Sequence, residues 1–85
     1  MNNIDPRSVA LGLEIRAEAA ARRVTIKDLC DAAEVNRSTL YNYLGGERDM
    51  PLGVLMALSD ALRVAPHDLL DRAEDRARTD ARLIG

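Results

Sequence analysis

Apolar residues recur along the chain at the spacing of an α-helix, and short polar or proline-containing breaks separate the runs. Leu11, Ile15 and Ala19 lie four residues apart and define the inward face of a first helix. Later runs repeat this spacing, and no run shows the strict alternation of a strand. The pattern therefore predicts an all-α chain with helices over residues 6–23, 26–33, 37–44, 51–62 and 66–83.

Residues at the breaks are those that begin and end helices. Asp5-Pro6 combines an N-cap carboxylate with a proline at the first helical position. Thr25 and Asp28 form a short capping box, and Asn36 can cap the third helix. Gly45-Gly46 can end that helix, because glycine adopts the left-handed conformation at little steric cost. Proline begins the last two helices, at Pro51 and Pro66.

The inward faces of these helices predict the core. The expected core residues of the second to fifth helices are Ile26, Leu29, Cys30, Ala33, Leu40, Tyr43, Leu52, Leu55, Leu58 (or Ser59), Leu62, Leu69, Leu70 and Ala73. Eighty-five residues with short loops predict one domain over residues 1–85, a compact bundle of four to five short helices.

Composition narrows the function. The chain has one cysteine and one histidine, so neither a disulfide nor a zinc site is expected, and we interpret Cys30 as a core residue and His67 as exposed. No run is long enough to span a membrane. Without a phosphate-binding glycine loop or a nucleophile with a histidine partner, we expect no enzyme, no cofactor and no small-molecule ligand. The expected location is the cytoplasm.

Residues 25–46 have the pattern of a helix-turn-helix, two short helices separated by three residues. In this motif the second helix enters the major groove, and its first turn contacts base edges. Here that helix, residues 37–44, has an outer face rich in hydrogen-bond donors and acceptors. A guanidinium such as that of Arg37 pairs well with guanine, and an amide such as that of Asn42 pairs well with adenine.

From Leu11 to Leu70 the sequence resembles the Cro/C1-type (XRE-like) helix-turn-helix family of phage repressors and bacterial transcriptional regulators. The matching residues are Leu11-Gly12, Ile15-Arg16, Val24-Thr25, Leu29, Val35, Arg37-Ser38-Thr39-Leu40, Gly46-Glu47-Arg48, Pro51-Leu52, Leu55, Leu58, Ala61-Leu62 and Leu69-Leu70. The resemblance implies a lambda-repressor-like DNA-binding fold and sequence-specific binding to a double-stranded, two-fold symmetric operator. It also implies a homodimer, at least on DNA.

The resemblance also implies roles for individual residues. It assigns Arg37, Ser38 and Asn42 to base edges, and Asn36, Thr39 and Arg48 to the DNA backbone. Tyr41 contacts either a thymine methyl at a base edge or the sugar-phosphate backbone, or it packs at the edge of the core. Lys27 flanks the surface that would meet the DNA backbone, so we expect it to contact a phosphate. Two positions depart from the family pattern. Ile26 replaces a glutamine that donates to phosphate, and Lys27 replaces that contact only in part. Glu34 replaces a turn glycine, which adds a negative charge near the DNA and, at positive φ, costs on the order of 1 kcal/mol.

Several alternatives stay open. The main alternative to a phage or prophage regulator is an antitoxin-like or other protein-interaction module on the same fold. RNA binding is a weaker alternative, because the sequence lacks the exposed aromatic residues on which single-stranded bases stack. The last helix, 66–85, is either a solvated helix with i, i+4 charge pairs or a dimerisation helix.

The net charge of −2 excludes binding through a broad basic surface. Binding would instead depend on a few residues, chiefly Arg37, Arg48 and Lys27.

Overall fold

The N-terminal caps set the beginnings of the first three helices. The computed structural model describes residues 4–84, with side chains to Ala81. α1 (Pro6–Arg22) begins after Asp5, whose side chain accepts from the Arg7 backbone N–H at 2.8 Å. α2 (Ile26–Ala33) begins with the complete capping box of Thr25 and Asp28. α3 (Arg37–Leu44) begins after Asn36, whose Oδ1 accepts from the Thr39 N–H at 2.8 Å. All three predicted caps are therefore confirmed.

The other helix boundaries are predicted less accurately from the local sequence. α4 (Leu52–Leu62) begins one residue after Pro51, which has an extended ψ of 146° and occupies the N-cap position, so the expected start at residue 51 is wrong by one. α1, α2 and α4 each end on a residue with positive φ, namely Arg23, Glu34 and Arg63. Only Glu34 was anticipated, because neither arginine is a residue type that favours this conformation.

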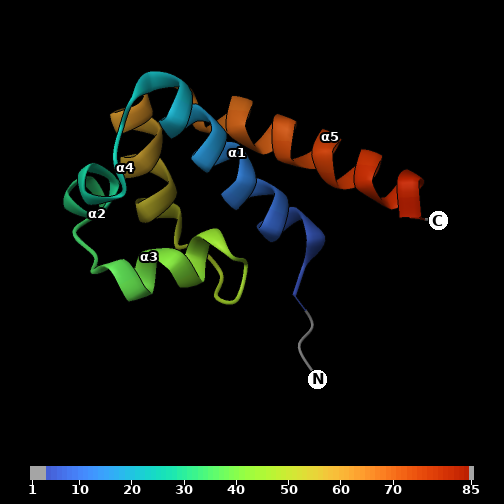
Figure 1. Cartoon of the computed structure of the whole chain (residues 1–85), viewed down its shortest axis with the longest axis horizontal. Helices are drawn as coiled ribbons and strands as arrows, with labels where there is room; N and C mark the ends of the chain where they lie inside the picture. The colour runs from blue at the N-terminus through green and yellow to red at the C-terminus, as the bar shows by residue number, and fades with distance from the viewer. Residues whose placement is uncertain (1–3, 85) are drawn as a thin grey trace.

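The core lies between the five helices, and α5 (Pro66–Ile84) lies along α1 (Figure 1). Its buried apolar residues are Ile15, Ala19, Leu29, Cys30, Leu40, Leu44, Leu55, Leu58, Leu62, Val64 and Leu69. Ser59 is also buried, and Leu11 and Ile26 pack at the edge of the core. Cys30 is therefore a core residue, as expected.

Two predicted core residues are exposed. Leu52 has 67% of its surface accessible. It lies in the first turn of α4, and α3 does not pack against α4 within the described chain, so α3 does not cover it. Leu70 is 43% exposed because Leu69 already occupies the buried side of α5, and consecutive helical residues point about 100° apart. Both corrections concern side chains at the edge of a packed face.

Ion pairs between side chains at the edge of the helix contact join α5 to α1. Arg76 donates to Glu14, with Nε 2.6 Å from the carboxylate oxygen, and Arg72 donates to Glu18. Arg7 lies 3.5 Å from Glu74 at the start of α1. Ala73 is buried, so the part of α5 around this residue packs on α1. Ala77 is half-buried and Ala81 exposed, while the side chain of Ile84 lies outside the described residues.

Candidate nucleic-acid interface

α2 and α3 form a rigid pair with a three-residue turn between them. Leu29 and Cys30 of α2 and Leu40 and Leu44 of α3 are buried in the same core cluster. Glu34 begins the turn with φ 55°, and its N–H bonds back to the Asp31 carbonyl. The inner sides of both helices are therefore fixed, and α3 presents its other side outward (Figure 1).

The outward side of α3 carries the polar residues of the candidate interface. Arg37, Ser38 and Tyr41 are exposed, and Asn42 is half-buried. Arg37 forms no ion pair with any described residue, so its guanidinium donors are available. The structure thus places all four predicted base-contacting residues on one exposed or half-exposed helix surface.

Two of the predicted backbone-contacting residues take part in the cap of α3. The Asn36 side-chain oxygen is occupied by the Thr39 N–H, so only the Asn36 amide nitrogen is left for a phosphate. Thr39 is half-buried. At the N-terminus of α3 the remaining backbone N–H groups and the helix dipole favour an anion.

Arg48 is held beside the end of α3 by the backbone. The N–H groups of Glu47 and Arg48 donate to the Asn42 carbonyl at 3.0 and 3.2 Å. Gly46 makes this reversal possible, because glycine adopts its φ of 76° without strain. A side chain there would also meet Val9 and Ile4. The Arg48 side chain is exposed and pairs with no carboxylate in the part of the chain described.

The basic residues around the end of α1 and the start of α2 have different partners. Arg22 pairs with Glu18 at 2.9 Å, and Lys27 lies 3.8 Å from Asp31 one turn along α2. Arg23 ends α1 in the left-handed conformation. Arg16 lies over the ring of Tyr41, with 5.6 Å between the guanidinium carbon and the ring centroid. The sequence did not place Arg16 against α3, because that contact depends on how α1 packs on α3.

The helix-turn-helix and the loop that follows it are acidic. Residues 24–50 contain three basic and five acidic residues, a net charge of −2. Hydrogen bonds from the backbone and hydroxyl of Thr25 lower the pKa of Asp28 below its usual value, so this carboxylate stays ionised at the N-terminus of α2. Arg37 and Arg48 are the cations of this segment that no described carboxylate neutralises.

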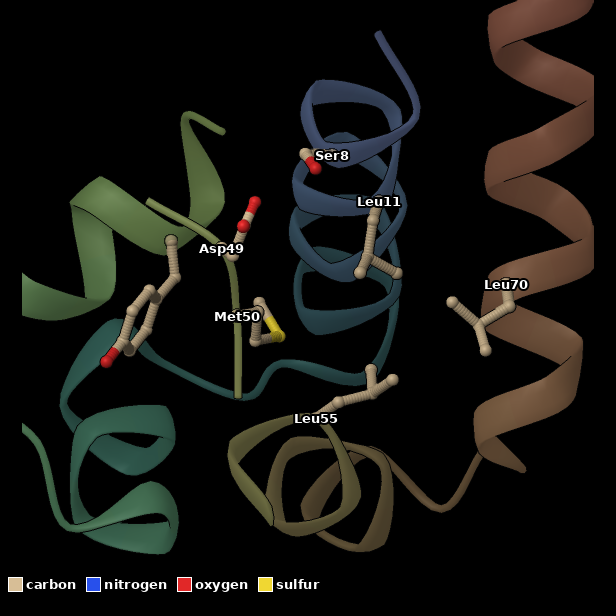
Figure 2. A pocket seen from close by; sticks show the side chains of 7 residues that line it. Ser8, Leu11, Asp49, Met50, Leu55 and Leu70 are labelled. Atoms are coloured by element: carbon tan, nitrogen blue, oxygen red, sulfur yellow. The ribbon is translucent and has the colours of Figure 1, made fainter. Parts of the chain in front are cut away.

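A cavity of about 200 Å³ lies on the inner side of α3 (Figure 2). Four apolar side chains line it (Leu11, Met50, Leu55 and Leu70), together with Ser8, Tyr43 and Asp49. Tyr43 therefore faces inward, as predicted, away from the exposed face of α3. The cavity is smaller than the roughly 300–1,000 Å³ of most small-molecule sites. Its volume does not favour a ligand of that size.

Other features bear on alternative chemistries. Residues 4–84 contain no group of three or more metal-ligating side chains brought together, and His67 is exposed, as predicted. None of the helices that the structure describes is long and apolar enough to cross a membrane.

Comparisons with known proteins agree with this geometry. Two solved structures of the clp gene regulator ClgR from Corynebacterium glutamicum have the same fold. One is 24% identical with a TM-score of 0.86, over 94% of this chain and 85% of that one. The other is 26% identical with a TM-score of 0.74, over 85% of this chain and 92% of that one. A comparison with curated protein sequences gave no match.

A family model, described as the Cro/C1-type HTH DNA-binding domain, matches residues 14–75. The match runs from the middle of α1 to the middle of α5 and includes both helices of the motif. It confirms the resemblance carried by the sequence, and the likeness to the ClgR structures confirms the predicted all-α bundle. The chain therefore belongs to the Cro/C1-type helix-turn-helix family of DNA-binding transcriptional regulators.

Proposed function

We propose that the chain is a sequence-specific regulator of the phage or prophage repressor/Cro type, which binds duplex DNA by inserting α3 into the major groove. One observation carries this proposal: α3 is capped by Asn36 and exposes Arg37, Ser38 and Tyr41 on its outward side. Major-groove binding by this motif needs that arrangement of a rigid inner face and a polar outer face.

The proposed contacts divide into two groups. Arg37, Ser38, Tyr41 and Asn42 contact base edges, with Arg37 donating to guanine and Asn42 to adenine. The backbone contacts come from Asn36, Thr39, Arg48 and Lys27. Because Lys27 lies within 3.8 Å of Asp31, its contribution to phosphate binding is smaller than that of Arg48.

The proposal includes a homodimer on DNA and assigns the chain no catalytic role. Two copies would contact half-sites roughly 34 Å apart on a two-fold symmetric operator. Residues 1–85 would act as one domain at the nucleoid, in the bacterial cytoplasm. Ala73 of α5 is buried against α1 of the same chain, whereas Ala81 is exposed, so a dimer through α5 would use the outer face or the C-terminal part of the helix.

Selection from a random duplex library, followed by footprinting, tests this function. We expect recovery of a two-fold symmetric sequence with two protected half-sites about one helical turn apart. Recovery of no preferred sequence would contradict sequence-specific binding. An asymmetric single protected site would contradict the dimer.

A second function, an antitoxin-like or other protein-interaction module, is favoured by exposed apolar residues on α4. Leu52 and Met56 lie one turn apart and are 67% and 50% exposed. Adjacent exposed apolar side chains of this size are common in protein interfaces. Binding to random duplex DNA at low salt separates the two functions, because only a DNA-binding chain gives a salt-dependent signal.

A further inference from the structure

Arg16 brings a cation from α1 to the surface of the recognition helix α3. Its guanidinium carbon lies 5.6 Å from the centroid of the Tyr41 ring. This distance is within the roughly 6 Å over which a cation is attracted to an aromatic face. Both side chains are exposed, so the pair lies on the surface and outside the core.

The hydrogen-bonding groups of Arg16 are not occupied by protein carboxylates. Arg22, Arg72 and Arg76 each pair with a glutamate, whereas Arg16 pairs with no acidic residue within residues 4–84. A guanidinium carries five N–H donors in its plane, and an aromatic ring face leaves most of them available. A phosphate, like a carboxylate, can accept hydrogen bonds from two of these donors at once.

The net negative charge of residues 24–50 explains why a further cation on α1 would matter for DNA binding. Residues 24–50 carry a net charge of −2, and only Arg37 and Arg48 stand there without a described carboxylate partner. Backbone contacts from this segment alone would be few. α1 packs directly on α3, so a cation on α1 is close enough to supplement them.

We propose that Arg16 extends the DNA interface onto α1, where it holds the Tyr41 ring in place and donates to a phosphate of the same half-site. This inference rests on the proposed function, since it needs α3 in the major groove. Arg16 acts on base recognition through Tyr41 as a positioning residue, and on affinity through its own phosphate contact.

The pairing with Tyr41 is tested first in the free protein. The chain has two tyrosines, so the Tyr41 ring signals can be assigned by NMR with a Tyr43→Phe variant. We expect Arg16→Gln to shift the Tyr41 ring signals, and the matched change Arg63→Gln to leave them unchanged. Arg63 follows α4, at the end of that helix away from α3 (Figure 1). Unshifted Tyr41 signals in Arg16→Gln would overturn the positioning role.

The phosphate contact is tested by fluorescence anisotropy with the duplex recovered by selection and a random duplex of equal length. We expect Arg16→Gln to weaken binding to both duplexes by about tenfold, as for loss of a charged hydrogen bond. The slope of log K against log salt should fall in magnitude by about 0.9 per protomer. Arg63→Gln should change neither. A double-mutant cycle with Tyr41→Leu should show about twofold to fivefold coupling on the selected duplex.

The outcomes separate this inference from the proposed function. If Arg37→Ala weakens binding while Arg16→Gln keeps wild-type affinity and salt slope, Arg16 lies outside the interface and the inference is wrong. Equal losses in Arg16→Gln and Arg63→Gln would show a general charge effect and would also overturn it. If the wild-type chain binds no duplex at low salt, the proposed function fails, and the Arg16 contact fails with it.

Discussion

Arg37 lies in the first turn of α3, exposed and without a described ion-pair partner, where a side chain of a major-groove helix contacts bases. We expect Arg37→Ala to cost about 1–3 kcal/mol of binding free energy and to relax the preference at one base position. Arg48→Ala is the control: it should weaken binding to all sequences alike and lower the salt slope. Competition among single-base variants of the selected duplex measures both effects. Equal loss on every sequence for Arg37→Ala would contradict base recognition.

Glu34 combines backbone strain with an unfavourable charge. Its φ of 55° costs a non-glycine residue on the order of 1 kcal/mol, and its carboxylate lies in the turn before α3. We expect Glu34→Gly to raise the free energy of unfolding by about that amount and also to tighten DNA binding. Glu34→Gln separates the two causes, because it removes the charge and keeps the strain. Urea unfolding and anisotropy should therefore show tighter binding without added stability for Glu34→Gln. Tighter binding by Glu34→Gly alone would contradict the charge effect.

Gly12 sets the distance between α1 and α3. A Cβ at this position would lie within 3.0 Å of three backbone atoms of Leu44, so α3 would have to move away from α1. We expect Gly12→Ala to lower the free energy of unfolding by about 1–3 kcal/mol, in spite of the better helix propensity of alanine. Gly53→Ala is the matched control, because a Cβ there meets no atom within 4 Å and should stabilise α4 by up to about 1 kcal/mol. Equal stability changes for the two variants in thermal unfolding would contradict the close-approach argument.

Glu18 joins α1 to α5 through charge. Hydrogen bonds from the Arg22 and Arg72 side chains lower the pKa of Glu18 below its ordinary value. A carboxyl with a lowered pKa in the folded state stabilises the protein above its unfolded pKa of about 4. This stabilisation is lost as the pH falls through the lower, folded value. We expect Glu18→Gln to be less stable than wild type at neutral pH and to lose less stability on acidification. Glu47→Gln is the control, since Glu47 is exposed and forms no ion pair with a described residue.

Local elements could be predicted from the sequence more fully than contacts between them. Asp5, Thr25 and Asn36 cap helices through bonds to residues two or three positions away, and such bonds depend on local sequence alone. The polar face of α3 follows from the same periodicity. The pairing of Glu14 with Arg76 joins residues 62 apart in sequence, so it depends on how α5 packs on α1. The contact of Arg16 with Tyr41 depends on tertiary packing in the same way.

At the scale of the whole molecule, charge decides how the protein would find DNA. The net charge of the chain is −2, and residues 24–50, which include the helix-turn-helix, carry −2 by themselves. A protein without a broad basic surface gains little from the counterion release that drives non-specific binding. If the proposed function is right, specific contacts by α3 supply an unusually large share of the affinity. We therefore expect a high ratio of specific to non-specific affinity. This expectation follows from the small number of basic residues available to phosphates and not from the fold.

The salt dependence of binding measures this balance directly. We propose that two or three cations per protomer (Arg48, Lys27 and Arg16) contact phosphates, so log K should fall with log salt with a slope of about −2 to −3 per protomer. Binding to a random duplex should be weak even at low salt, while the selected duplex stays bound at higher salt because its base contacts release few ions. Anisotropy titrations over a salt series on both duplexes test this. A slope several times steeper, or equal affinity for the two duplexes, would show that a diffuse positive field binds the DNA and would contradict recognition through α3.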